Sequence, residues 1–218
     1  MKKVYVLGSE GNGLVIAAAI SRNHPEAEIV FLSDSHSVGQ LIGRIKALPV
    51  VGGTSDANVL AQEEGSFVIS AFGGITNPAK NIETLNSFSF DKSRWLTFID
   101  NTAVIPYDFC RIGRDVFIGP LAQLSPDVTI GDHCSIFGNA FVGHDSVIGE
   151  FCHLATNSVV GSNVMVGKGV HIGSNSVIRE HVKIGDYSII GAGAVVVKDV
   201  PEKAVVVGNP AKVLRIKE

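Results

Sequence analysis

The sequence predicts an α/β domain over residues 1–100, followed by a parallel β-helix domain over residues 101–218. Two observations lead to this fold class. Residues 112–201 repeat every six positions, a period that fits neither an α-helix nor a simple strand and is typical of a parallel β-helix. Residues 1–100 lack this period and alternate between strand-like and helix-like segments.

The first domain is expected to be a small Rossmann-like unit with a parallel sheet, because its strands alternate with helices. The expected elements are, in order, a strand at Val4–Leu7, a helix at Gly13–Asn23, a strand at Ile29–Leu32, a helix from Thr54 to about Glu64, a strand at Phe67–Ala71 and a helix at Pro78–Phe88. Residues Trp95–Asp100 then lead into the repeats.

The repeats predict the geometry of the second domain. An aliphatic residue occupies the same place in all fifteen hexapeptides, from Ile112 to Val196, and a small or β-branched residue follows four places later. Three hexapeptides make one triangular coil, so about five coils are expected, with adjacent coils about 4.8 Å apart. Glycine follows the aliphatic residue in ten of the fifteen repeats. Gly, Asn and Asp are expected at the corners, because these residues adopt positive φ at low cost.

Composition limits the classes of function. The chain has 218 residues, 45% of them hydrophobic, and a net charge of −3, so a soluble globular protein is expected and a nucleic-acid partner is not. No apolar run is long enough for a membrane span, so no membrane partner is expected. The three cysteines lack a disulfide-like spacing, which favours a reducing cytoplasm with Cys134 and Cys152 as stacked core thiols.

A glycine-rich turn follows the first strand. Its sequence, GSEGNG at residues 8–13, lets the backbone approach a phosphate at a helix N-terminus. Asp34, after the second strand, is placed to accept a hydrogen bond from a sugar hydroxyl or a base. The spacing differs from the dinucleotide motif GxGxxG. The turn therefore indicates either a nucleotide or nucleotide-sugar site, or a purely structural feature.

The second motif lies within the repeats. His144 and Asp145 occupy a corner of the expected β-helix, where side chains point outward, and His153 falls on the side that follows. An imidazole beside a carboxylate is the usual composition of a general base. The alternative is that these are ordinary surface residues.

Histidines in the repeats raise the question of a metal site. Five fall there, namely His133, His144, His153, His171 and His181. His153 and His171 are expected to stack one coil apart and could supply half of a zinc site. No third ligand falls at a matching corner, so we expect no metal.

Four features together resemble the sugar acyltransferase family of sialic acid O-acetyltransferases and bacillosamine-pathway N-acetyltransferases. They are the unbroken hexapeptides, the HDxxIGEFxH string at residues 144–153, the GNPAK tail at residues 208–212 and the N-terminal glycine-rich turn. The resemblance covers nearly the whole chain. It implies a left-handed β-helix, an exception to the usual right-handed crossover, and a homotrimer with active sites between subunits.

The resemblance also implies acetyl-CoA as the donor and a nucleotide-linked amino sugar as the acceptor. His144 matches the family's catalytic base, and Asp145 matches the acid that raises its basicity. His153 matches the residue that contacts the thioester region of acetyl-CoA, while Ser174 and Ala192 fall where the family's backbone holds the pantetheine arm.

In the first domain the resemblance implies a nucleotide site. Glu10, Gly11 and Asn12 match the turn that surrounds the nucleotide. Asp34 matches the acid near the base, and Gly73 matches the close-approach glycine after the third strand.

The chain departs from the family pattern at two places. Phe137 stands where many members carry an asparagine near the reacting amine, and Asn139 could take over that role. The segment GGITN at residues 73–77 differs from the shorter Gly-Asn turn of the family. Both departures concern how the acceptor is recognised.

The sequence therefore predicts an acetyl-CoA-dependent N-acetyltransferase of a nucleotide-linked amino-deoxy sugar, in the synthesis of a cell-surface glycan or lipopolysaccharide. The amine attacks the thioester directly while His144 takes its proton. Two alternatives stay open. One is sugar O-acetylation of the sialic-acid type, and the other is a non-catalytic hexapeptide scaffold that binds a nucleotide sugar.

Overall fold

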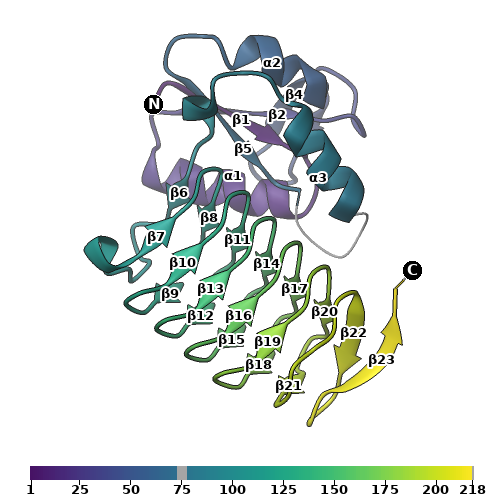
Figure 1. Cartoon of the computed structure of the whole chain (residues 1–218). Coiled ribbons are helices and arrows are strands. Elements are labelled where there is room, and N and C mark those ends of the chain that lie inside the picture. The colour runs from purple at the N-terminus through teal and green to yellow at the C-terminus, as the bar shows by residue number, and fades with distance from the viewer. Residues whose placement is uncertain (73–77, 218) are drawn as a thin grey trace. The chain divides into compact units, whose positions relative to one another are not determined.

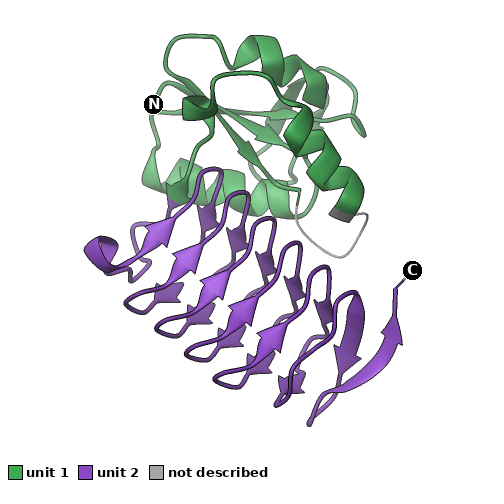
Figure 2. Cartoon of the chain, viewed as in Figure 1, with its two compact units in different colours: residues 1–72, 79–98 green, residues 73–78, 99–218 purple. Residues whose placement is uncertain are grey.

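The computed structural model describes residues 1–72 and 78–217, which fall into two compact units (Figure 1, Figure 2). The first unit holds Met1–Phe72 and Ala79–Phe98, and the residues from Ile99 onward belong to the second. Gly73 and the rest of the GGITN segment lie outside the described residues. Among the described residues, no helix combines the length and the hydropathy that crossing a membrane requires.

The first unit is built on a five-stranded sheet with the strand order β3-β4-β2-β1-β5. The predicted strands are present as β1 (Lys3–Leu7), β2 (Glu28–Leu32) and β5 (Ser66–Ser70), with β1 parallel to both of the others. The first and last predicted helices are present as α1 (Asn12–Asn23) and α3 (Pro78–Ser87). A 3-10 turn, η2 (Lys92–Arg94), leads out of the unit.

Two parts of the first unit differ from the prediction. A hairpin of β3 (Leu41–Ile42) and β4 (Leu48–Gly52) extends the sheet, with β4 parallel to β2. The helix expected from Thr54 to Glu64 is only a 3-10 turn, η1 (Thr54–Asp56), and a short α2 (Ala57–Leu60). It ends early because the Ser66 hydroxyl donates to the Glu63 carbonyl, at 2.7 Å, and Gly65 adopts a φ of 80°, which turns the chain into β5.

The second unit is a triangular β-helix whose three sides are three sheets. The first side consists of β7 (Arg111–Ile112), β10 (Thr129–Ile130), β13 (Val147–Ile148), β16 (Met165–Val166) and β19 (Lys183–Ile184). The second side consists of β8 (Phe117–Ile118), β11 (Ser135–Ile136), β14 (His153–Leu154), β17 (His171–Ile172) and β20 (Ile189–Ile190), flanked by β6 (Phe98–Ile99) and by β22 (Ala204–Val207) and β23 (Lys212–Ile216). The third side consists of β9 (Gln123–Leu124), β12 (Phe141–Val142), β15 (Val159–Val160), β18 (Val177–Ile178) and β21 (Val195–Val196).

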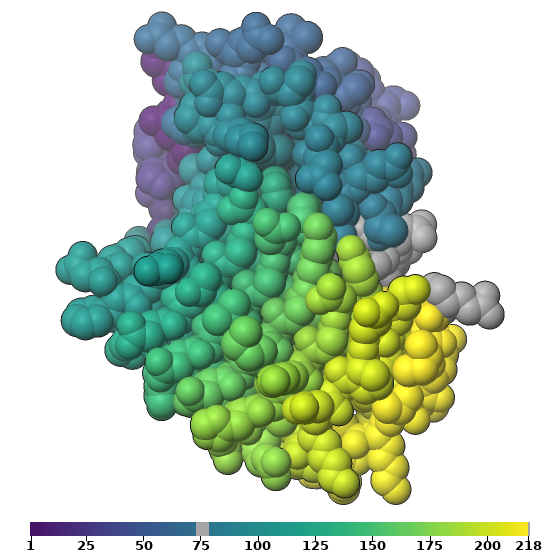
Figure 3. Space-filling view, in the orientation of Figure 1, coloured from purple at the N-terminus to yellow at the C-terminus, as the bar shows by residue number. Residues whose placement is uncertain are grey.

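The predicted register is confirmed along the whole repeat. Residues one coil apart pair in parallel, for example Ile130 with Ile148. Of the fifteen repeated aliphatic residues, fourteen are buried and Ile112 is partly buried. They fill the axis of a left-handed β-helix of about five coils, as expected. In the space-filling view the coils form successive bands from teal to yellow (Figure 3).

The repeated glycine has a different physical reason from the one expected. The corner residue with positive φ lies two places after it and is often not glycine, as Phe151 shows with a φ of 60°. A Cβ on Gly149 would lie 2.8 Å from the carbonyl carbon and oxygen of Gly167 in the next coil. The glycine is therefore required by the close approach of adjacent coils.

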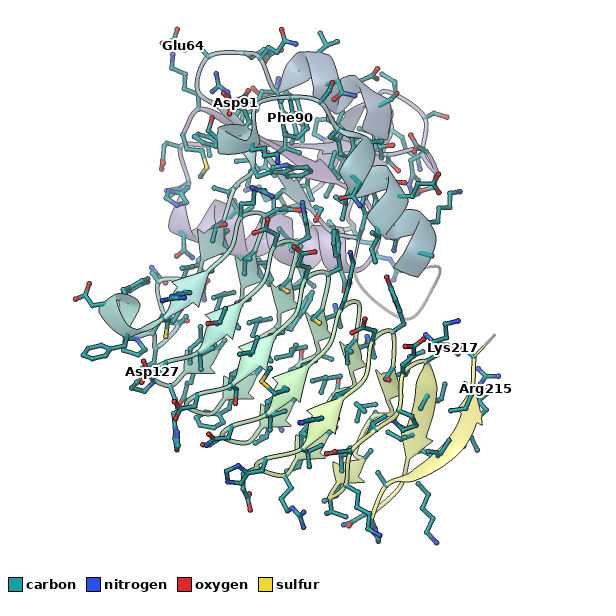
Figure 4. The ribbon with its side chains drawn as sticks, in the orientation of Figure 1. Glu64, Phe90, Asp91, Asp127, Arg215 and Lys217 are labelled. Carbon is teal, nitrogen blue, oxygen red and sulfur yellow. The ribbon has the colours of Figure 1, made fainter. Side chains whose placement is uncertain are left out.

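The C-terminal tail caps the last coil. β22 pairs in parallel with β20 and buries Ala204 and Val206, and β23 then runs antiparallel to β22. The turn between them contains the cis peptide bond Asn209–Pro210. Arg215 and Lys217 lie together at this end of the unit (Figure 4).

Candidate functional site

The predicted base lies at an exposed corner of the β-helix. His144 and Asp145 connect β12 on the third side to β13 on the first side. His144 Nδ1 lies 2.7 Å from Asp145 Oδ2, and the two side chains are 57% and 53% exposed. Asp127, one coil earlier at the same corner, points away from the axis (Figure 4). Because the carboxylate accepts the Nδ1 proton, Nε2 of the neutral ring is left to accept a proton.

A second histidine–aspartate pair, which the sequence analysis missed, lies inside the protein. His133 Nδ1 is 2.7 Å from Asp115 Oδ2, and these side chains are only 7% and 0% exposed. The His133 ring also stacks on Phe151, with centroids 4.9 Å apart. The pair joins two adjacent coils. Its burial favours a structural role and leaves the exposed His144 as the base available to a substrate.

His153 has a different environment from His144. It is 8% exposed, and its ring stacks on that of His171, with centroids 4.8 Å apart and planes 8° apart. Burial, and secondarily the neighbouring His171, lowers the pKa of His153 to about 3. Its buried Nδ1 has no hydrogen-bond partner among the described residues. A buried unpaired acceptor costs less than a buried unpaired N–H, so we place the proton on Nε2. His153 is therefore a neutral hydrogen-bond donor rather than a base.

Phe137, the departure from the family pattern, packs against His153. Its ring centroid lies 4.9 Å from that of His153 and 5.4 Å from that of Phe117. Phe137 therefore supports the His153 ring and offers no polar group to an amine. Asn139, the suggested substitute, is exposed at the corner between the second and third sides.

The two predicted pantetheine positions lie at that same corner. Ser174 follows β17 and Ala192 follows β20, so they occupy equivalent places in adjacent coils. The Gly193 N–H donates to the Ser174 carbonyl oxygen at 2.9 Å, which ties the two turns together. With His153 on the second side, the three predicted cofactor residues lie on one side of the β-helix or at its edge.

The structure separates the three predicted cofactor residues from the predicted base. The chain passes from the first side to the second, to the third and back to the first. His144 lies at the corner between the third and first sides, which is opposite the second side that carries His153. One chain therefore does not bring His144 and His153 together. The third side has the His144 corner at one edge and the Ser174 corner at the other.

In the first unit the predicted turn lies at the carboxyl end of β1. Glu10 is exposed, Gly11 precedes α1 with a φ of 33°, and Asn12 begins the helix. A Cβ on Gly13 would overlap the carbonyl oxygen of Gly8, which itself has a φ of 97°. The turn therefore needs glycine both for its conformation and for close packing of helix on strand.

Asp34 follows β2 as predicted, is exposed, and already holds Thr54 through its carboxylate. Its two oxygens accept hydrogen bonds from Thr54, one from the backbone N–H at 2.8 Å and one from the hydroxyl at 2.5 Å.

Sequence reasoning missed a polar cluster beside Asp34, formed by Ser9, Ser33, Ser35 and His36. Two features of the sequence could have indicated this cluster. They are Ser9 inside the glycine turn and the polar residues SDSH at positions 33–36, after the second strand.

No group of three or more His, Cys, Asp or Glu side chains in the described part of the chain has the geometry of a metal site. The two buried thiols expected in the core serve as donors between coils. Cys134 Sγ donates to the Gly149 carbonyl at 3.1 Å, and Cys152 Sγ donates to the Gly167 carbonyl at 3.0 Å. Burial raises the pKa of Cys134 well above its ordinary value, so this thiol stays protonated.

Comparison with known proteins gives three results. A family model described as the GMPPB C-terminal domain matches residues 96–212. No curated protein matches the chain. Among solved structures, a histidine-to-asparagine mutant of perosamine N-acetyltransferase from Caulobacter crescentus, in complex with CoA and GDP-perosamine, is 26% identical, with a TM-score of 0.83 and coverage of 98% of this chain and 97% of that one.

Two further solved structures are similar over the same length. The acetyltransferase domain of PglB from Neisseria gonorrhoeae FA1090 is 26% identical, with a TM-score of 0.81 and coverage of 98% of this chain and 100% of that one. WeeI from Acinetobacter baumannii AYE is 24% identical, with a TM-score of 0.81 and the same coverage, and this likeness bears on the fold alone.

Proposed function

Because the chain belongs to the GMPPB C-terminal domain family over residues 96–212, and resembles two solved acetyltransferases along its length, we propose that it is an acetyl-CoA-dependent N-acetyltransferase of a nucleotide-linked amino sugar. The observation that carries the proposal is the match, over 98% of the chain, to an N-acetyltransferase solved with CoA and GDP-perosamine. The predicted enzyme class, the coenzyme A co-substrate and the resemblance to sugar acyltransferases are thereby confirmed.

In this proposal His144 is the general base. The amine nitrogen of the sugar forms a bond to the thioester carbonyl carbon, and His144 Nε2 takes the proton that the nitrogen loses. The carbon–sulfur bond then breaks, and the proton passes to the coenzyme A sulfur. Asp145 holds the ring with Nε2 facing solvent, since it accepts from Nδ1 at 2.7 Å. A positioned base of this kind typically contributes a factor of about 10² to 10⁴.

In the same attack on the thioester, His153 acts as a hydrogen-bond donor rather than as a base. Its Nε2–H is a neutral donor, and the thioester carbonyl becomes an oxyanion as the amine attacks. A preorganised donor aimed at that oxygen stabilises the transition state more than the ground state. Ser174 and Ala192 provide the backbone that holds the pantetheine arm.

A homotrimer would bring the separated residues together. The outward column of the third side begins with Gln123 and continues with four partly exposed apolar residues, namely Phe141, Val159, Val177 and Val195. An apolar column of this kind is typical of an interface core. If three chains turn their third sides toward a common axis, the His144 corner of each meets the Ser174 corner of the next. This is a closed heterologous ring, with one shared site at each contact.

The first unit would hold the nucleotide. Glu10, Gly11 and Asn12 surround the carboxyl end of β1, and Asp34 lies at the end of β2, where open α/β sheets bind ligands. Donor and acceptor are cytoplasmic metabolites, and the three free thiols suit that reducing compartment. The product would serve the synthesis of a cell-surface glycan such as lipopolysaccharide.

The direct test measures release of free thiol from acetyl-CoA with a panel of UDP-, GDP- and dTDP-linked 3-amino and 4-amino sugars and with free sialic acid. We expect turnover with one class of nucleotide-linked amino sugar. Turnover with sialic acid alone would make the protein an O-acetyltransferase. Absence of thiol release throughout, with nucleotide binding retained, would support a non-catalytic scaffold.

A further inference from the structure

Asp34, the acid after β2, has a structural role in the first unit. In α/β nucleotide sites, an acidic side chain at this place commonly accepts a hydrogen bond from a ribose hydroxyl. Here both Asp34 oxygens accept from Thr54, at 2.8 Å from its N–H and 2.5 Å from its hydroxyl. These bonds connect the loop after β2 to the start of η1. Asp34 therefore has a structural task that explains its presence without a ligand.

A nearby histidine is held in a fixed orientation. His36 Nδ1 lies 2.8 Å from the hydroxyl of Ser9, in the glycine turn, and 3.2 Å from that of Ser35. The Ser9 hydroxyl lies 2.8 Å from that of Ser33. Ser9 and Ser33 are 1% and 5% exposed, so the network that orients the imidazole is buried.

The direction of these hydrogen bonds assigns the proton on His36. Ser9 has a single hydroxyl proton and donates it to Ser33. Ser9 must therefore accept from His36, which places a proton on Nδ1. In the neutral ring Nε2 is then an acceptor. Among the hydrogen bonds of the described residues, His36 Nε2 takes part in none.

The network also places the His36 ring beside the glycine turn, where the phosphate is expected. Ser9 is adjacent to Gly8, at the carboxyl end of β1, and His36 follows β2, the neighbouring strand. The glycine turn and the start of α1 offer backbone N–H groups, which suit the phosphates of a nucleotide. A ribose is bonded directly to those phosphates and brings hydroxyl donors with it.

We propose that His36, rather than Asp34, accepts the hydrogen bond of a ribose hydroxyl in the bound nucleotide. This assignment rests on the proposed function, because it needs a nucleotide at the glycine turn.

The test measures binding of UDP, GDP and dTDP to the full chain by titration calorimetry, and continues with the tightest of the three and its analogue that lacks the ribose hydroxyls. His36→Asn keeps a donor near the Nδ1 position and loses the Nε2 acceptor. His36→Gln keeps an acceptor near the Nε2 position. Asp34→Asn tests the neighbouring acid in the same way, and His24→Asn, at the other end of α1 from the glycine turn, is the matched control. Thermal unfolding of each variant checks its fold.

We expect His36→Asn to weaken binding of the natural nucleotide roughly five- to tenfold, the usual effect of one lost hydrogen bond, and to leave binding of the hydroxyl-free analogue unchanged. His36→Gln should recover part of the loss. Asp34→Asn weakens the contacts with Thr54, so any loss of binding that it causes should be equal for the nucleotide and its analogue. His24→Asn should bind both compounds like the wild type. In His36→Asn, equal losses for the nucleotide and its analogue would overturn this assignment and leave the proposed function untouched. The same holds for a loss in Asp34→Asn that appears with the natural nucleotide and not with its analogue. A wild-type protein that binds no nucleotide would overturn both this assignment and the proposed nucleotide site.

Discussion

At the scale of single residues, three histidines of the β-helix have different chemistry because their surroundings differ. His133 is buried against Asp115 and joins two coils. His153 is buried without a charged partner, which keeps its ring neutral. His144 is exposed and paired with Asp145, so it combines access to a substrate with a fixed orientation. The roles follow from burial and partners rather than from residue type.

Replacement of the proposed base, His144, gives the first prediction. His144→Ala should lower the turnover number at least about a hundredfold, because a positioned base contributes 10² to 10⁴. The affinity for coenzyme A should change little, because the proposed pantetheine contacts lie at another corner. Steady-state kinetics and coenzyme A titration measure both quantities. His181→Ala, an exposed histidine of the same corner, is the control. Near-full activity of His144→Ala would remove it from the mechanism.

The low pKa of His153 predicts a dependence of stability on pH. The pKa is about 3 in the folded chain and about 6.5 in the unfolded chain. Between these values the unfolded state binds more protons, so the contribution is complete above about pH 6.5 and is lost as the pH falls toward 3. At pH 5 the loss is at most about 2 kcal/mol.

Urea unfolding at pH 7.5 and pH 5 measures this effect. In His153→Phe the fall in unfolding free energy between the two pH values should be smaller than in the wild type by up to about 2 kcal/mol. His181→Phe is the control and should keep the wild-type difference. An identical acid dependence in His153→Phe and wild type would contradict the environment described for His153.

At the scale of the elements, the spacing between coils limits substitution at the repeated glycine. Gly149→Ala places a Cβ 2.8 Å from the Gly167 carbonyl, so the coils must shift. We expect a loss of about 1–3 kcal/mol in unfolding free energy. Arg179→Ala, at the same place of another repeat, should cost less than about 0.5 kcal/mol because that side chain is exposed. Chemical denaturation of both variants makes the comparison, and equal stabilities would refute close approach as the reason for glycine.

The β-helix could be predicted from the sequence because its signal repeats fifteen times and each repeat is stabilised by its neighbours. In the first unit the signals occur once. The hairpin of β3 and β4 was missed because β3 has only two residues and β4 contains Pro49, which is unfavourable inside a strand. The segment of η1 and α2 was predicted too long because the hydrogen bond from Ser66 to Glu63 is a tertiary detail.

The individual residues of the candidate site could be predicted from the sequence, but most of the contacts between them could not. His144, Asp145 and His153 were found from a local string, and their spacing along the repeat fixes the sides on which they lie. The His133–Asp115 pair was missed because the two residues come from different coils. The hydrogen bonds between Asp34 and Thr54 were missed because the two residues are 20 positions apart in sequence.

At the scale of the whole molecule, the proposal requires that the third side be an interface between chains. Val177, 38% exposed, lies in the middle of its apolar column. Val177→Glu would place three carboxylates near a common axis, so sedimentation should show monomers and activity should be lost. Met165→Glu, on the first side and 48% exposed, is the matched control and should remain trimeric and active. A trimer that persists in Val177→Glu would show that the third side does not form the interface.

The most direct measurement combines two inactive chains. His144→Ala and His153→Ala proteins are co-expressed in equal amounts, and acetyl transfer is compared with each variant alone. If each site joins His144 of one chain to the second side of the next, the co-expressed population recovers about a quarter of the wild-type sites, because about three quarters of the trimers are mixed and one of the three contacts in each is intact. Mixed trimers no more active than the separate variants would show that one chain supplies both histidines, contrary to the structure described here.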